Sequence, residues 1–282
     1  MLSLSASLIC CFAAFSATNE FATAAPPKAA DHVRVLTFNL WQEGTSVEGG
    51  FEKIVDVVVA SRADLVALTE VRNYGGKDLH ERLLAACKAK GVSYRGVFAG
   101  GDVGLLSRFP IVGTEVASDD GEAQAGPIMA YSIELPGGKA ACVCVAHLDY
   151  RNYAAYLPRG YDGNSFQMID RDGDGEPDPI TRVSDIQRMD EASSRDEAVK
   201  AFLRYAKTRK RNRIPVILTG DFNEASHLDW TRATRDLWDH NGVVMPWENS
   251  TRLAKGGFID AWREVHSDPV KRPGHTWPSS AF

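Results

Sequence analysis

From residue 33 onward, short apolar runs rich in β-branched residues alternate with segments whose apolar residues recur at helical spacing. No linker interrupts this succession, and no internal repeat appears in it. The pattern predicts helices at 51–61, 77–90 and 184–209, and strands at 33–40, 64–71, 94–98, 103–106, 111–116, 128–135, 140–146 and 215–219. We therefore expect an α/β protein whose two mixed sheets pack face to face, with helices on the outer sides.

Composition narrows the class of ligand. The chain has 282 residues, of which 44% are hydrophobic, and a formal net charge of −5. That apolar content suffices for a sizeable core. A mildly acidic chain lacks the broad basic field that drives tight non-specific binding to nucleic acid or anionic membranes. It does not exclude a small anionic substrate that is held through a metal ion.

Polar side chains end several of the predicted strands. Asn39 ends the first, Glu70 follows the second, His147 ends a later one, and Asp221 and Asn223 follow the last. Each of them alone is commonly a turn cap. Strand ends meet at one rim of a layered sheet fold, where Glu and Asn oxygens suit Mg²⁺, Mn²⁺ or Ca²⁺. Together and in this order, these residues predict a hydrolytic site.

Six motifs follow one another along the chain: LTFNLW at 36–41, LVALTEV at 65–71, GLLSRFPI at 104–111, AHL at 146–148, LTGDFN at 218–223 and GFIDAWR at 257–263. This ordered set resembles the endonuclease/exonuclease/phosphatase superfamily, from near residue 33 to near residue 277. The resemblance implies a four-layered α/β sandwich and divalent-metal-dependent hydrolysis of phosphoester bonds.

Roles for individual residues follow from the matching motifs. Glu70 is implied as the principal ligand of Mg²⁺ or Mn²⁺, helped by Asn39. His147 would contact the scissile phosphate, and Asp221 would orient or activate the attacking water. Asn223 would donate to phosphate oxygens. The chemistry agrees, because a phosphodiester repels hydroxide until a cation and fixed donors neutralise its oxygens.

The sequence departs from the superfamily pattern at its end. The superfamily normally finishes with a strand leading to Ser-Asp-His, and that tripeptide does not occur here. The Asp239–His240 pair precedes the motif at 257–263, so its position does not match. We expect a domain over 31–282 that lacks its C-terminal end, and hence a 282-residue chain that is inactive.

The N-terminal segment predicts export. Residues 1–19 carry no charge, and a short apolar run leads to small residues at 22–25, as in a cleavable signal peptide. We therefore expect residues 1–30 to be a signal peptide or a disordered tail, and the protein to be periplasmic or extracellular. Three cysteines remain, Cys87, Cys142 and Cys144. Three thiols form no closed disulfide framework, and we expect them to be buried.

An acidic loop offers a second site. The run from Asp170 to Asp178 places carboxylates at alternate positions, which is compatible with Ca²⁺ binding. It is not an EF-hand, because Thr181 stands at the twelfth position. A solvated acidic loop is the alternative. Asp149 beside His147 could serve either the metal site or the local loop. The tyrosines at 150, 153, 156 and 161 could stack on a base or sugar, or pack within the loop.

We therefore expect an exported, metal-dependent phosphoester hydrolase, and a phosphodiesterase rather than a phosphomonoesterase. Its substrate could be nucleic acid, a phospholipid headgroup or a sugar phosphate. We expect a monomer without stable membrane insertion, since no apolar run is long enough to span a bilayer. The alternatives are a non-catalytic calcium- or ligand-binding module on the same scaffold and an inactive fragment.

Overall fold

The computed structural model describes residues 32–118 and 128–276, so the predicted signal peptide at 1–30 lies outside the described residues. The described chain divides into two compact units. The first takes residues 32–118, 128–147 and 204–221, and the second takes residues 148–203 and 222–276.

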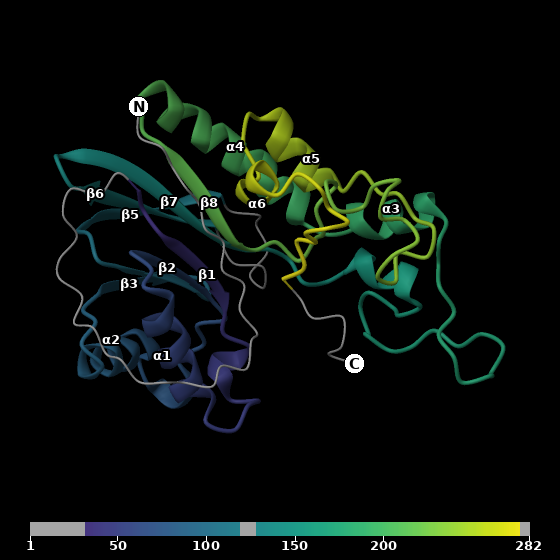
Figure 1. Ribbon diagram of the computed structural model, residues 1–282, viewed down its shortest axis with the longest axis horizontal. Coiled ribbons are helices and arrows are strands. Elements are labelled where there is room, and N and C mark those ends of the chain that lie inside the picture. Colours follow the sequence, from purple (N-terminus) through teal and green to yellow (C-terminus); the bar gives the residue numbers. More distant parts are fainter. Residues whose placement is uncertain (1–31, 119–127, 277–282) are drawn as a thin grey trace. The chain divides into compact units, whose positions relative to one another are not determined.

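The first unit contains two four-stranded mixed sheets (Figure 1). Their strands are β1 (Val35–Asn39), β2 (Leu65–Thr69), β3 (Arg95–Gly100), β4 (Val103–Ser107), β5 (Ile111–Ser118), β6 (Ile128–Leu135), β7 (Lys139–His147) and β8 (Val216–Asp221). One sheet has the order β1-β2-β4-β3, with β1 and β2 parallel and the other pairs antiparallel. The other has the order β5-β6-β7-β8, with β7 and β8 parallel and the rest antiparallel. Each sheet thus carries a parallel pair at one edge.

Alternating side chains of the central strands build two layers of core. Along β2, Leu65 and Ala67 face the opposite sheet, whereas Val66 and Leu68 face α1 (Gly50–Ser61) and α2 (Leu79–Ala89). The two short helices therefore cover the outer face of the first sheet (Figure 1). This face-to-face packing of two mixed sheets, flanked by helices, confirms the expected fold class.

The outer face of the second sheet carries the cysteine pair. Cys142 and Cys144 are buried free thiols on one face of β7, and their sulfurs lie 3.7 Å apart. Tyr205, on the part of α4 (Arg195–Arg211) that belongs to the first unit, lies 3.4 Å from the Cys142 sulfur. Cys87 is buried in α2, and it is also a free thiol. The expectation of buried, unbridged thiols is thus confirmed for all three.

The second unit is helical and loop-rich around its own aromatic core. Trp230 and Trp247 pack edge to face there, beside Leu157 and Ile186. The rings of its loop contact one another, because Tyr156 meets Tyr153, Tyr161 and Phe166. These contacts support packing within the loop for Tyr153, Tyr156 and Tyr161, whereas Tyr150 is 48% exposed. Its helices are η3 (Ala154–Arg159), α3 (Val183–Glu191), the first half of α4, α5 (Glu248–Lys255) and α6 (Ala261–Val265).

The single helix predicted at 184–209 is wrong. Two helices, α3 and α4, are separated at residues 192–194. The hydroxyl of Ser193 donates to the Asp190 carbonyl at 2.7 Å, and the hydroxyl of Ser194 lies 3.2 Å from the Asp149 carboxylate. Serine side chains that compete for backbone partners favour helix ends, so the break has a local cause.

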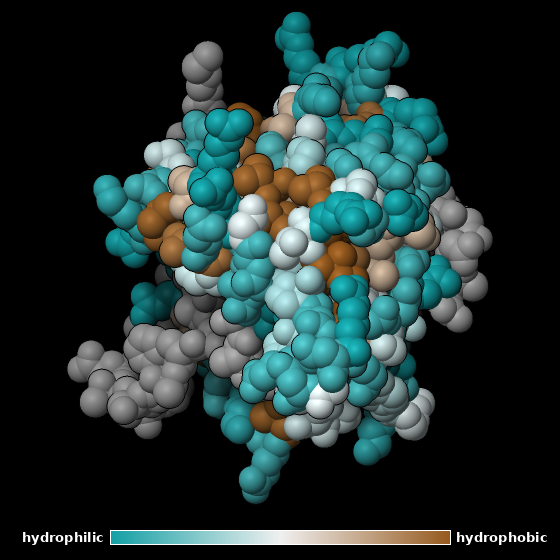
Figure 2. Space-filling view, turned by 90° about the vertical axis from the view of Figure 1, so that its right-hand side faces the viewer, coloured by the Kyte–Doolittle hydropathy of each residue, from teal (hydrophilic) through white to brown (hydrophobic). Residues whose placement is uncertain are grey.

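Exposed apolar residues are dispersed among polar ones. The face in Figure 2 is largely hydrophilic, with separate hydrophobic areas. Among the described residues the most exposed large apolar side chains are Ile259 (73%), Val265 (65%) and Val112 (63%), from three separate segments. Within residues 32–118 and 128–276, no helix is long and apolar enough to cross a membrane.

Candidate active site

The two parallel strand pairs of the first unit bring predicted site residues together. Asn39 ends β1 and Asp221 ends β8, and the Asn39 amide donates to the Asp221 carboxylate at 2.8 Å. His147 ends β7 in register with Asp221. Residues 182 positions apart in the chain therefore share one rim, because each lies at the carboxyl end of its strand.

A glycine permits the close approach of β8 to β7 at this rim. Gly220 has φ +128, and a Cβ there would overlap the carbonyl oxygen of Ala146. Any side chain at 220 would displace Asp221 from its register with His147. The glycine in the GDFN motif is thus explained by packing.

Glu70 follows β2 in a left-handed backbone conformation, with φ 62. A non-glycine residue rarely adopts this φ without compensation. One compensation is the N–H of Gln42, which donates to the Glu70 Oε2 at 2.7 Å.

The donor set at the rim fits a hard divalent cation. Glu70 supplies a carboxylate, and Asn39 a carbonyl oxygen that already accepts the Trp41 N–H at 2.8 Å. An amide oxygen has two lone pairs, so Asn39 retains one for a ligand. Oxygen ligands of this kind are those that Mg²⁺ and Mn²⁺ prefer.

His147 is held by a residue that the sequence did not single out. Its Nδ1 lies 2.8 Å from the Oδ2 of Asp102, and the guanidinium of Arg72 lies 3.0 Å from the same oxygen. Burial favours a neutral imidazole, but the hydrogen bond and charge of Asp102, with Asp221 and Glu70, outweigh it and raise the pKa of His147 above its ordinary 6.5. The imidazole is thereby prepared to donate to an anion.

Neither Asp102 nor Arg72 was predicted. Asp102 lies in the turn between β3 and β4, where the neighbouring glycines indicate only a turn. Arg72 lies two residues beyond Glu70. The turn with Asp102 belongs to the first sheet and His147 ends a strand of the second sheet, so their meeting depends on tertiary structure and has no signal in the local sequence.

Asn223 and Asp149 belong to the second unit. The Asn223 amide donates to the Leu148 carbonyl at 2.9 Å, with φ 48 at Asn223. Asp149 accepts from the Arg151 guanidinium at 2.9 and 3.0 Å and from the Ser194 N–H at 3.3 Å. Asp149 was expected to serve either the metal site or its local loop, and these contacts support the role in the loop.

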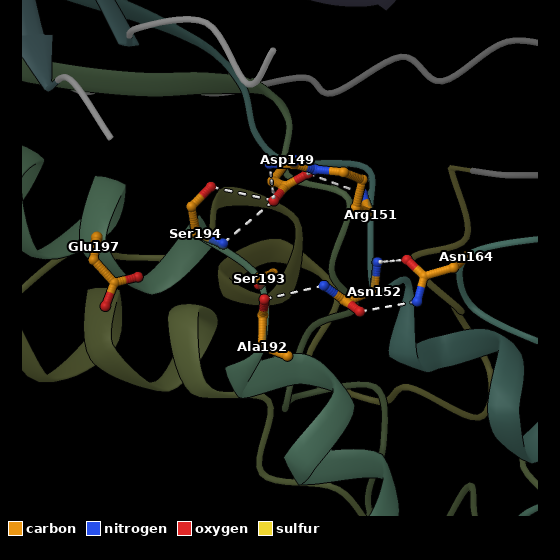
Figure 3. A pocket seen from close by; sticks show the side chains of 8 residues that line it. All are labelled: Asp149, Arg151, Asn152, Asn164, Ala192, Ser193, Ser194 and Glu197. Carbon is orange, nitrogen blue, oxygen red and sulfur yellow. Dashed lines mark hydrogen bonds and ion pairs between the residues drawn. The ribbon is translucent and has the colours of Figure 1, made fainter. Parts of the chain in front are cut away.

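Asp149, Arg151 and Ser194 line a cavity of about 410 Å³ in the second unit (Figure 3). The side chains of Asn152 and Asn164 bond to each other at its wall at 2.9 Å. Its polar groups thus satisfy one another to a large extent and hold the loop rather than point to a ligand. The lining residues are Asp149, Arg151, Asn152, Asn164, Ala192, Ser193, Ser194 and Glu197.

The acidic loop of the second unit gathers carboxylates. Ligand oxygens of Asp170, Asp172 and Asp174 lie within 4.8 Å of one another, and all three residues are exposed. The N–H groups of Gly173 and Gly175 donate to Asp170 at 2.7 and 3.1 Å. The loop is thus curled around its acidic side chains.

Comparison with known proteins identifies the family. The model of the Endonuclease/Exonuclease/phosphatase family matches residues 36–281. The chain belongs to this family. It is therefore a hydrolase of phosphoester bonds, as its motifs had indicated.

Individual relatives are distant. An uncharacterized protein of Caenorhabditis elegans is 26% identical over 246 residues, which is 87% of this chain and 70% of the relative. The catalytic domain of human Nocturnin with a bound sulfate anion is 17% identical with a TM-score of 0.40, over 79% of this chain and 71% of that one. The 3′ phosphatase NExo from Neisseria, bound to a product DNA hairpin, is 12% identical with a TM-score of 0.41, over 77% and 70%. An endonuclease/exonuclease/phosphatase from Beutenbergia cavernae is 19% identical with a TM-score of 0.43, over 75% and 49%.

Proposed function

We propose that the protein is a divalent-metal-dependent phosphodiesterase whose active site is the rim formed by Asn39, Glu70, His147 and Asp221. The observation that carries the proposal is the convergence of these strand ends, marked by the contact of Asn39 with Asp221 at 2.8 Å. Family membership supports the reaction class.

Glu70 and Asn39 would hold Mg²⁺ or Mn²⁺. When bound, such an ion supplies positive charge that neutralises phosphate oxygens. Asn39 has a second task, because its amide fixes the Asp221 carboxylate through the 2.8 Å hydrogen bond. One side chain thus links the metal-binding half of the site to the half that activates water.

The remaining residues act on the phosphate and on water. Protonated His147, whose pKa is raised beside Asp102, donates to a non-bridging phosphate oxygen through its Nε2. Asp221 accepts a proton from the attacking water, and phosphorus gains that oxygen as the bond to the ester oxygen breaks on the opposite side. The leaving oxygen keeps the electron pair of that bond and takes a proton from solvent. Fixed donors of this kind lower the barrier because they are oriented before charge develops.

The test separates metal binding from hydrolysis. Glu70→Gln should weaken Mn²⁺ binding, read from the electron paramagnetic resonance of free Mn²⁺, by about tenfold or more. Glu48→Gln, an exposed acid in the neighbouring segment, is the matched control. Equal Mn²⁺ affinity in Glu70→Gln and the unaltered protein would overturn the metal assignment.

Hydrolysis is measured with Mg²⁺ or Mn²⁺ on bis(para-nitrophenyl) phosphate, a diester, and on para-nitrophenyl phosphate, a monoester. Metal-dependent release by the 282-residue chain would contradict the expectation from its sequence that this chain is inactive. Where release occurs, the diester should be hydrolysed faster than the monoester, and Asp221→Asn should remove hydrolysis while Mn²⁺ binding persists. Nucleic acid, a phospholipid and a sugar phosphate then compete as substrates. Binding of Mn²⁺ at Glu70 with no hydrolysis of any of them would favour the non-catalytic alternative.

A second function is favoured by the clustered carboxylates of the acidic loop. We propose that Asp170, Asp172 and Asp174 bind Ca²⁺, since their ligand oxygens already lie within 4.8 Å. Asp172→Asn should abolish sensitised Tb³⁺ luminescence from the loop, whereas Asp236→Asn, exposed elsewhere in the second unit, should not. Identical luminescence in both variants would exclude this site. Such a site suits the exported, monomeric protein that we propose.

A further inference from the structure

Glu43 is a buried carboxylate beside the proposed active site that the reaction itself does not use. It follows β1 in the short η1 turn (Gln42–Gly44) and is only 4% exposed. Burying a charge is costly unless hydrogen bonds and opposite charges compensate. A leucine would fill similar space without that cost. The groups that Glu43 binds should therefore explain why a carboxylate is buried here.

The carboxylate of Glu43 binds the backbone that follows Glu70. Its Oε1 accepts the N–H of Arg72 at 2.8 Å and the N–H of Asn73 at 2.5 Å. The guanidinium of Arg82, on α2, lies 3.9 Å from its other oxygen. One side chain thus satisfies two consecutive amides of the segment that carries Glu70.

A hydrogen bond in the reverse direction completes the contact. The N–H of Gln42, the residue before Glu43, donates to the carboxylate of Glu70 at 2.7 Å. The segments at 42–43 and 70–73 therefore clasp each other reciprocally, side chain to backbone in both directions. We call this arrangement the loop clasp.

The clasp holds backbone that would otherwise relax. Four of its residues are non-glycine residues with positive φ: Gln42 at 58, Glu43 at 58, Glu70 at 62 and Asn73 at 53. Such conformations persist where surrounding contacts over-determine them, and they gather at functional sites. The hydrogen bonds to Glu43 supply that constraint for the 70–73 segment.

We propose that Glu43 is a positioning residue that fixes the 70–73 segment, so that Glu70 presents its carboxylate to the metal and Arg72 reaches Asp102. Arg72 and His147 contact the same oxygen of Asp102. The position of the 70–73 segment therefore also affects how Asp102 holds His147. The inference rests on the proposed function, in which Glu70 is the principal metal ligand.

Two isosteric variants separate hydrogen bonding from packing. Glu43→Gln keeps an oxygen that can accept both N–H groups, whereas Glu43→Met has similar length and no comparable acceptor. Because loss of an outer-shell partner typically costs 10–100-fold in metal affinity, we expect Glu43→Met to weaken Mn²⁺ binding by about tenfold or more. Glu43→Gln should stay within about threefold of the unaltered protein.

Hydrogen exchange gives a readout that needs no metal. The amides of Arg72 and Asn73, assigned by NMR, should exchange faster in Glu43→Met than in Glu43→Gln. Glu48→Gln is the exposed control, with unchanged exchange and Mn²⁺ affinity. Should Glu43→Met fail to fold, the comparison of Glu43→Gln with Glu43→Asp, whose shorter side chain withdraws the acceptor, gives the same contrast.

The outcomes distinguish this inference from the proposed function. If Glu70→Gln leaves Mn²⁺ affinity unchanged, the proposed metal site is wrong. The loop clasp is then tested by hydrogen exchange of the Arg72 and Asn73 amides alone. If Glu70→Gln weakens binding but Glu43→Met binds Mn²⁺ normally, the positioning role of Glu43 is wrong. Equal losses in Glu43→Gln and Glu43→Met would also overturn it, since the accepted hydrogen bonds would then not matter.

Discussion

At the scale of single residues, the Asp102–His147 pair makes stability depend on pH. The pKa of His147 is raised in the folded protein, because Asp102 and the nearby acids outweigh burial. A raised histidine pKa adds stability that is fully present below the unfolded value of about 6.5 and is lost as pH rises through the folded value. The pair should therefore stabilise the fold more at about pH 5.5 than at about pH 8.5.

Asp102→Asn tests this expectation. It should lower the pKa of His147, because the charge of Asp102 then no longer opposes the effect of burial. The pKa is measured from the NMR signal of the His147 ring in metal-free protein. Urea unfolding should show a loss of about 2 kcal/mol at acid pH and a smaller loss at alkaline pH. Asp56→Asn, an exposed acid, is the control. An equal loss at both pH values would contradict the pairing.

Site residues differ in how far sequence can reveal them. Asn39, Glu70, His147 and Asp221 follow strands whose apolar pattern is local, so their place at strand ends could be predicted. Asp102, Arg72 and Glu43 lie in turns, and each gains its meaning from a partner 29 to 45 residues away. Nothing in the neighbouring sequence marks such partners.

At the scale of elements, α2 packs on β4 through the contact of the His80 ring with Gly104. His80 is 4% exposed, and neither of its ring nitrogens has a hydrogen-bond partner among the described residues. A Cβ at Gly104 would overlap the Cε1 and Nε2 atoms of that ring. The missing side chain at Gly104 is therefore what lets α2 approach the sheet.

Gly104→Ala should lower the free energy of unfolding by about 1–3 kcal/mol, as overpacking does. In a His80→Ala background the same change should cost much less, because the ring that it meets is gone. Gly113→Ala, on β5, serves as the control, since its nearest neighbour, Ser132, would lie at 3.9 Å. Additive losses in the double variant, measured by urea unfolding, would show that the two positions do not interact.

Elements were predictable where their pattern is strong. The strand at 128–135 matches β6 at both ends, because its apolar residues and flanking glycines are unambiguous. The helix at 184–209 failed at Ser193 and Ser194, whose hydroxyls bind Asp190 and Asp149. Helix α5 was not predicted, and it contains only two apolar residues, Leu253 and Ala254. Local pattern thus defines apolar elements and fails where side-chain hydrogen bonds end a helix.

At the scale of the whole molecule, each unit has its own core, and Arg195 is central to the second. Its side chain is completely buried and bonds to the carbonyls of Asp149, Arg151 and Asn152 at 2.8–3.0 Å. It also pairs with Asp190 at 2.8 Å. The start of α4 is thereby fixed to the loop at 149–152.

A second buried acid depends on the same arginine. Glu224 lies 4.0 Å from the Nε of Arg195, and burial, together with the charge of Asp190, raises the pKa of Glu224 to about 7. A raised carboxyl pKa means that the folded state favours the protonated acid, so stability falls as pH rises from about 4.3 toward 7. Arg195 opposes that fall, because its charge favours the ionised acid.

Arg195→Leu should therefore destabilise the second unit by about 3–5 kcal/mol, since it leaves two acids and three carbonyls buried without their partner. Tryptophan fluorescence during urea unfolding reports this unit through Trp230 and Trp247. The loss should grow as pH rises through about 7, because Glu224 must then ionise without a cation. Arg188→Leu, exposed on α3, should change stability by less than about 0.5 kcal/mol. A loss in Arg195→Leu no greater than in Arg188→Leu would mean that packing, rather than the buried charge network, maintains the second unit.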